Sequence, residues 1–175
     1  MVNSHPSKEK AMFHHALLQA FLSFIFALFL VSPYAWDLIA RASMSILNIV
    51  GVQTTYVEAQ FLIYLRLMDG TVVGFQILTE CSGLITIVIF TFISAFTIGL
   101  LRGRLSIKLF WFALSIFLGF IWNLARLASV IAVAYHFGLA SFSFVHYILA
   151  PTIDFVWVVS LWALGMSWLK KEEQA

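Results

Sequence analysis

The sequence predicts an all-α integral membrane protein, a single membrane domain over residues 1–175. About four transmembrane helices are expected, with an interfacial helix and a small extracytoplasmic β-hairpin. Two observations support this class. The chain is 62% hydrophobic and 10% charged, whereas a water-soluble domain carries about 25% charged residues. Its 18 Phe and 6 Trp suit lipid-facing and interfacial positions. The net charge of +2 is too small to indicate a nucleic-acid partner.

The first transmembrane helix is expected over residues 12–32, after a polar cytoplasmic tail of residues 1–11. About 20 apolar residues, at roughly 1.5 Å per residue, cross the ~30 Å hydrocarbon core of a bilayer. Residues 34–50 are expected to form an interfacial helix, in which Asp37 and Arg41 pair at i,i+4. A short second span is the alternative for these residues. It would place the N-terminus outside, which the lysines of the tail oppose.

Residues 52–80 are expected to form an extracytoplasmic, strand-like segment. Strand-forming residues stand on both sides of Asp69-Gly70, and Asp-Gly in this setting is typical of a β-hairpin turn. The unpaired amide groups of a small sheet cannot face lipid. The hairpin should therefore lie outside the hydrocarbon, in water or among the lipid headgroups.

Three further transmembrane helices are expected over residues 83–101, 109–135 and 146–169, with a loop between the last two over 136–145. The short loop before residue 109 contains Arg and Lys, and the C-terminal tail begins with two lysines. Both are cytoplasmic by the positive-inside rule, as is the N-terminal tail. The chain is thus predicted to lie in the cell membrane with both termini in the cytoplasm and the hairpin outside.

Three polar side chains from different helices are predicted to reach the same depth, at the outer face. Cys81, the only cysteine, stands at the start of the second span. Arg126 follows Lys108 by about 18 residues, which is roughly 27 Å along a helix. His146 begins the last span. We therefore expect Cys81, Arg126 and His146 to converge.

These three residue types together can perform acyl transfer through a thioester. A neighbouring imidazole or guanidinium favours the reactive thiolate of a cysteine. His146 can take the thiol proton and later give it to an amine leaving group, and Arg126 can stabilise an oxyanion. Taken singly, each has a structural explanation, since a lone Cys is usually inert and an Arg can snorkel to the headgroups. The combination is what indicates catalysis.

Further residues are expected to support this set. Asn123 shares a helix face with Arg126, and can hold it or polarise a carbonyl. Gly83 permits close backbone approach to a peptide substrate. Asp154 is an intramembrane carboxylate, which is costly unless it is paired. We expect it to support either Arg126 or His146.

Three short motifs resemble those of the exosortase/archaeosortase family of membrane transpeptidases. They are CSGL at residues 81–84, NLAR at 123–126 and VHY at 145–147, in this order and with a strand-like segment before the cysteine. The resemblance covers roughly residues 60–165. It implies that Cys81 is the nucleophile and that Arg126 and His146 complete the catalytic set, while Ser82 belongs to the cysteine motif.

The resemblance also implies the substrate and the partners. These would be secreted proteins with a C-terminal sorting signal, made of a short motif, a hydrophobic span and a basic tail. The enzyme would cleave near the motif at the outer membrane face and pass the acyl group to an amine or lipid acceptor. The resemblance does not specify the sorting motif, the acceptor, or the choice between transfer and hydrolysis.

Other classes of function are less well supported by the residues. A non-catalytic membrane subunit, using this scaffold to assemble a membrane or surface-polysaccharide complex, is the main alternative. A transporter would need polar residues along a path across the bilayer, and the inner halves of the second, third and fourth spans are almost wholly apolar. A single Cys excludes an intramolecular disulfide and a Cys-rich metal site. Neither a metal nor a cofactor is expected.

Overall fold

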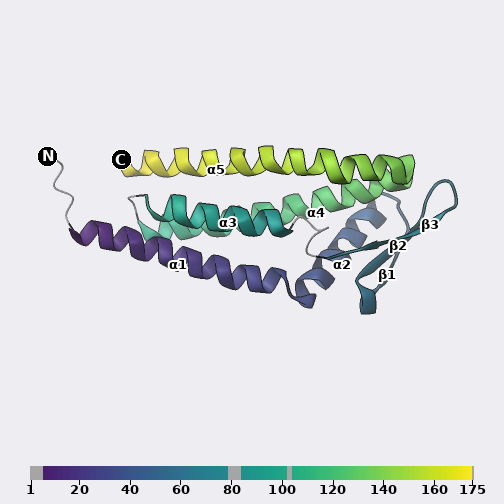
Figure 1. Cartoon of the computed structure of the whole chain (residues 1–175), viewed down its shortest axis with the longest axis horizontal. Helices are drawn as coiled ribbons and strands as arrows, with labels where there is room; N and C mark the ends of the chain where they lie inside the picture. Colours follow the sequence, from purple (N-terminus) through teal and green to yellow (C-terminus); the bar gives the residue numbers. More distant parts are fainter. Residues whose placement is uncertain (1–5, 79–83, 102–103, 175) are drawn as a thin grey trace. The chain divides into compact units, whose positions relative to one another are not determined.

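The computed structural model describes residues 6–78, 84–101 and 104–174. Within this part the chain is mainly helical with one small sheet, which confirms the predicted all-α class (Figure 1). The helices are α1 (Pro6–Leu30), α2 (Pro33–Ile49), α3 (Leu84–Gly99), α4 (Leu105–Phe144) and α5 (Ala150–Gln174). The strands are β1 (Thr54–Val57), β2 (Leu62–Arg66) and β3 (Val72–Gln76).

Two helical stretches of the described chain are long and apolar enough to cross a membrane, Glu9–Leu30 and Leu105–Lys171. The second includes both α4 and α5. Helix α3 is apolar but has only 16 described residues. The predicted count of four spans, and the positions of the termini, therefore stay predictions.

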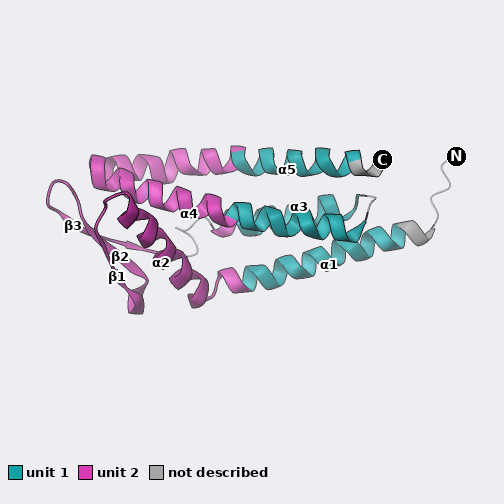
Figure 2. Ribbon diagram, turned by 180° about the vertical axis from the view of Figure 1, so that it is seen from behind, with its two compact units in different colours: residues 1–28, 86–119, 157–175 teal, residues 29–85, 120–156 magenta. Residues whose placement is uncertain are grey.

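The chain divides into two compact units (Figure 2). Unit 1 comprises residues 1–28, 86–119 and 157–175. Unit 2 comprises residues 29–85 and 120–156. Helices α1, α3, α4 and α5 contribute residues to both units.

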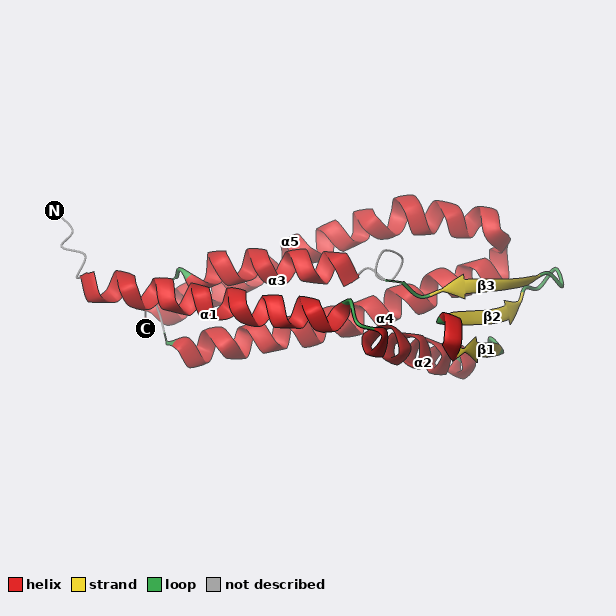
Figure 3. Cartoon of the chain, turned by 60° about the horizontal axis from the view of Figure 1, so that its bottom comes forward, coloured by secondary structure: helices red, strands yellow, loops and turns green. Residues whose placement is uncertain are grey.

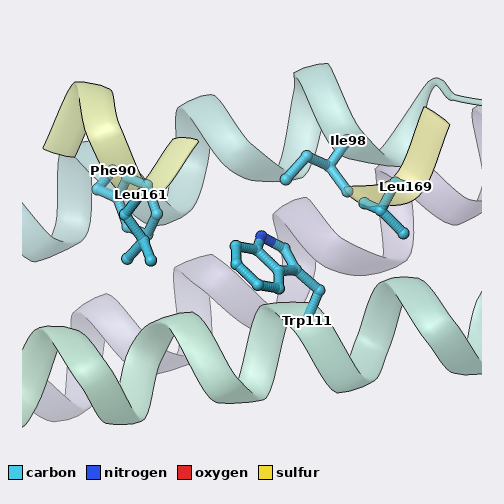
Figure 4. Packing of buried hydrophobic residues seen from close by; sticks show 5 residues of the cluster. All are labelled: Phe90, Ile98, Trp111, Leu161 and Leu169. Carbon is cyan, nitrogen blue, oxygen red and sulfur yellow. The ribbon is translucent and has the colours of Figure 1, made fainter. Parts of the chain in front are cut away.

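Unit 1 has an apolar core shared by α3, α4 and α5 (Figure 4). Its buried members are Phe90, Ile98, Trp111, Leu161 and Leu169. Hydrogen bonds between helices supplement this packing. The indole N–H of Trp162 donates to Thr97 Oγ1 over 2.9 Å, and the Ser23 hydroxyl donates to the Thr91 carbonyl over 3.2 Å.

The structure buries Lys108, which sequence reasoning placed in a cytoplasmic loop. Helix α4 begins at Leu105, so Lys108 lies in its first turn, with 1% of its surface exposed. Its ammonium donates to the Gly99 carbonyl over 2.7 Å and to that of Leu101. Carbonyls at a helix C-terminus lack partners within the helix. The loop prediction for Lys108 was therefore wrong, because this side chain satisfies the carbonyl end of α3.

In unit 2, α2 is an amphipathic helix, so the helical prediction for residues 34–50 is confirmed. Ser32 caps its first turn, since the Ser32 hydroxyl accepts from the Ala35 N–H over 3.4 Å, and Pro33 follows at a position that suits the start of a helix. One face is buried. Its residues are Ala35, Ile39, Ala40, Ser43 and Leu47.

The opposite face of α2 carries the predicted ion pair. Arg41 Nε lies 2.8 Å from Asp37 Oδ2, and Arg41 Nη2 lies 2.9 Å from Glu58 Oε2. The Tyr56 hydroxyl donates to Asp37 Oδ1 over 2.8 Å. Hydrogen bonding from Arg41, and then from Tyr56, lowers the pKa of the Asp37 carboxyl despite some desolvation. This cluster ties α2 to strand β1.

The three strands form one antiparallel sheet in the order β1-β2-β3, beside α2 (Figure 3). Strands β2 and β3 form the hairpin predicted around Asp69-Gly70, and Gly70 has a φ of +91°. The Asp69 carboxylate accepts from the Thr71 N–H over 2.8 Å, and this hydrogen bond lowers its pKa. The hairpin is confirmed, and its extracytoplasmic position stays a prediction.

The predicted loop over residues 136–145 is wrong, because the chain there is helical except at Gly138. Gly138 has φ +79° and ψ 177°, a conformation that is essentially restricted to glycine. The chain reverses direction at this point and continues through a π-helical turn, Val145–Leu149, into α5 (Figure 1). Ser141 and Ser143 bond the carbonyls four residues earlier, which allows serine within a helix.

Candidate active site

Four of the predicted site residues lie in unit 2. Asn123 and Arg126 belong to α4, His146 to the π-helical turn and Asp154 to α5. The reversal at Gly138 folds α4 back along the start of α5 and brings Arg126 against Asp154. Cys81, Ser82 and Gly83 lie outside the described residues.

Arg126 and Asp154 form a buried ion pair between α4 and α5. Arg126 Nε lies 3.1 Å from Asp154 Oδ2, and the two side chains are 11% and 7% exposed. The indole N–H of Trp122 donates to Asp154 Oδ1 over 3.0 Å. Of the two predicted partners for Asp154, the structure selects Arg126. The carboxylate thus holds the guanidinium from one side.

Two buried donors on one face of α4 have no acceptor within the described chain. They are Asn123 Nδ2 and Arg126 Nε. The contact of Arg126 Nε with Asp154 is an ion pair without hydrogen-bond geometry. Asn123 is only 2% exposed. Buried polar groups are nearly always satisfied, so a buried donor without an acceptor calls for an explanation.

Other buried polar atoms of the described chain, such as Trp36 Nε1 and Trp111 Nε1, also lack a hydrogen-bond partner. Asn123 and Arg126 differ from these because they stand at i and i+3 on one helix, in the unit that also holds His146.

His146 is half-buried and held by aromatic neighbours. Its ring stacks on Phe142 with the ring centroids 5.1 Å apart and an interplanar angle of 8°. The ring of Tyr147 meets it edge-on at 4.7 Å. Arg126 is close enough for its charge to act on the imidazole. The π-helical turn, a feature frequent at functional sites, sets the direction of this ring.

A cavity of about 420 Å³ in unit 2 opens beside His146. One wall is β3 and the residue after it, and Phe75 of this wall packs against Phe142 with centroids 4.9 Å apart. The other walls come from α4 and the π-helical turn. They are lined by Leu127, Val130, Ile131, Leu139, Phe142, His146 and Tyr147. The volume is in the range of small-ligand pockets, about 300–1,000 Å³.

Sequence reasoning did not identify Trp122 as part of this site. It stands four residues before Arg126 on the same helix face, and this spacing was the available signal. Among the residues that the structure describes, no group of three or more His, Cys, Asp or Glu side chains could hold a metal ion.

Comparison with known families decides the affiliation of the chain. The sequence model of the transmembrane exosortase family matches residues 9–172. The chain belongs to the transmembrane exosortase family. This exosortase is therefore a membrane protein, as its composition predicted, and the resemblance seen in three short motifs extends over nearly the whole chain, including the N-terminal third. Searches of curated proteins and of solved structures gave no significant match.

Proposed function

We propose that this exosortase is a cysteine-dependent membrane transpeptidase. It cleaves the C-terminal sorting signal of secreted proteins at the outer membrane face and transfers the acyl group to an acceptor. The observation that carries this proposal is a pair of buried nitrogen atoms in the same unit as His146. Asn123 Nδ2 has no hydrogen-bond acceptor in the described chain, and Arg126 Nε has only its ion-pair contact with Asp154. Such donors are what an oxyanion requires.

Each side chain has one role in the proposed reaction. His146 accepts the thiol proton of Cys81, and the thiolate sulfur attacks the carbonyl carbon of the scissile peptide bond. Arg126 and Asn123 donate hydrogen bonds to the oxyanion, and Asp154 with Trp122 holds the guanidinium in place. The C–N bond then breaks, and the imidazolium gives its proton to the departing amine.

The second half of the reaction releases the acyl group. An amine or lipid acceptor gives a proton to His146 and attacks the thioester carbon of Cys81. The C–S bond breaks, the sulfur regains a proton, and a new amide or ester bond is left on the product. Water in place of the acceptor would give hydrolysis. A substrate with its own apolar span and basic tail would lie beside the enzyme in the same orientation.

The alternative is a non-catalytic membrane subunit. The buried Arg126–Asp154 pair favours it to the extent that such a pair can simply fix the packing of two helices. In that case Cys81 and His146 would be dispensable, and the buried Asn123 amide without a hydrogen-bond acceptor would have no explanation.

The rate of alkylation of Cys81 by iodoacetamide against pH separates the two functions. As the only thiol in the chain, Cys81 gives an unambiguous signal in detergent micelles. We expect the wild-type midpoint to lie below the ~8.5 of a free thiol, and to rise in His146→Ala and in Arg126→Ala. The exposed His136→Ala is the matched control and should leave the midpoint unchanged. An ordinary midpoint that neither variant moves would support the non-catalytic subunit.

A further inference from the structure

We propose that the free edge of β3 binds the substrate as an added β-strand, which places an extended peptide beside His146. This inference rests on the proposed function, because it concerns how that site holds its peptide. Among the residues that the structure describes, β3 pairs with β2 alone in the sheet order β1-β2-β3. Its other side is an edge, and an edge offers a row of backbone donors and acceptors to a peptide.

The hydrogen-bond pattern identifies the backbone groups on this edge. The Leu67 N–H bonds the Thr71 carbonyl, and the Ile77 N–H bonds that of Phe61. In an antiparallel pair, hydrogen-bonded and non-bonded positions alternate. Counting in steps of two between these bonds, Val73 and Phe75 are the residues of β3 whose backbone groups bond to β2.

The backbone groups of the intervening residues, Val72, Gly74 and Gln76, therefore point away from β2. Within the described chain these groups have no backbone partner. They form a free row with a spacing of two residues, about 6.8 Å.

The free edge borders the cavity that contains His146. Residues 73–77 line it continuously, and the opposite walls come from α4 and the π-helical turn. A peptide strand on β3 would lie in this space, with the rings of Phe75 and Phe142 beside its side chains. The nucleophile follows closely in the sequence, because Cys81 is five positions after Gln76.

Gly74 lies at the centre of the edge and has no side chain to obstruct it. The ring of Tyr64 covers one face of it so closely that a Cβ at Gly74 would come within 2.9 Å of Tyr64 Cε1. The Tyr64 ring therefore occupies the space on the sheet face that a side chain at Gly74 would fill. The backbone of Gly74 can then be approached closely along the edge by another chain.

Electrophilic peptide probes test the proposal. A tetra-alanine vinyl sulfone adds the Cys81 sulfur to its β-carbon, and the α-carbon takes up a proton. We expect it to label Cys81 faster than the corresponding single-alanine probe. N-methylation of one amide at a time should slow labelling roughly twofold to tenfold at alternate positions only, because only those N–H groups face β3.

A pair of variants provides the test on the protein side. Gln76→Pro removes a backbone N–H of the free row, whereas Gln76→Ala keeps it and loses only the side chain, which donates to the Gln60 carbonyl. We expect Gln76→Pro to label with the tetra-alanine probe roughly twofold to tenfold more slowly than Gln76→Ala.

The reaction with iodoacetamide separates the possible failures. Both Gln76 variants should keep the wild-type iodoacetamide profile, which reports the folded state and the activated thiol. If that profile is kept while N-methylation acts equally at every position or nowhere, the added-strand mode is overturned and the proposed function stands. The same holds if the tetra-alanine probe labels Cys81 no faster than the single-alanine probe. A thiol that His146 does not activate counts against the proposed function itself.

Discussion

The Arg126–Asp154 pair is the residue-scale feature on which the candidate site depends most. Both charges are nearly out of reach of solvent, and each is compensated chiefly by the other. Trp122 adds a hydrogen bond to the carboxylate. Removal of one member of such a pair leaves a buried charge uncompensated, which is more costly than the loss of an exposed ion pair.

Asp154→Asn should lower the free energy of unfolding by about 3–5 kcal/mol, because it leaves the buried Arg126 guanidinium without a counter-charge. Glu9→Gln is the matched control, since Glu9 is exposed, and it should change the value by less than about 0.5 kcal/mol. Unfolding in mixed micelles of increasing denaturing detergent, followed by tryptophan fluorescence, measures both variants. Equal stability of the two variants would contradict the buried pair.

At the scale of elements, one glycine decides how α4 meets α5. Gly138 has a backbone conformation that side chains exclude, and a Cβ there would meet nothing within 4 Å. The cost of a substitution is thus conformational and not steric. The reversal it produces is what folds Arg126 back against Asp154.

Gly138→Ala should destabilise the protein by about 1–3 kcal/mol. Gly119→Ala is the matched control, because Gly119 is helical and a Cβ there would make ordinary contacts with Trp157 and Ile87 at 3.5–3.6 Å. We expect Gly119→Ala to be neutral or to stabilise by up to about 1 kcal/mol. The same detergent titration compares them. A Gly138→Ala variant as stable as Gly119→Ala would mean that this turn is not fixed as described.

At the scale of the whole molecule, the orientation in the membrane decides which side the candidate site faces. Family membership makes the chain a membrane protein, and the positive-inside rule predicts the hairpin and Cys81 on the outer side. The candidate site requires this orientation if its substrates are secreted proteins.

A membrane-impermeant maleimide should label Cys81 in right-side-out vesicles and not in inverted ones. Arg104→Cys in a Cys81→Ser background is the matched control, since Arg104 is exposed in the predicted cytoplasmic loop and should react only in inverted vesicles. Mass spectrometry of the labelled chain gives the result. The opposite pattern would place the candidate site on the cytoplasmic side and overturn the proposed substrates.

The sequence by itself determined the features that depend on composition or on neighbours along the chain. Membrane character follows from the total of apolar residues. The turn at Asp69-Gly70 and the Asp37–Arg41 pair are local, so the identities of two nearby residues suffice to predict them. The family motifs are also short and local, and the family match extends them.

Only the tertiary structure decided which distant groups meet. Lys108 is a solvated loop residue by local criteria and becomes a buried partner of the α3 carbonyls. Residues 136–145 carry Gly and Ser and so are predicted as a loop, whereas the chain there is helical except at Gly138. Asp154 had two possible partners, and the reversal at Gly138 selected Arg126. For Lys108 and for the Arg126–Asp154 pair, the deciding free energy comes from burial against another segment of the chain, which no local pattern records.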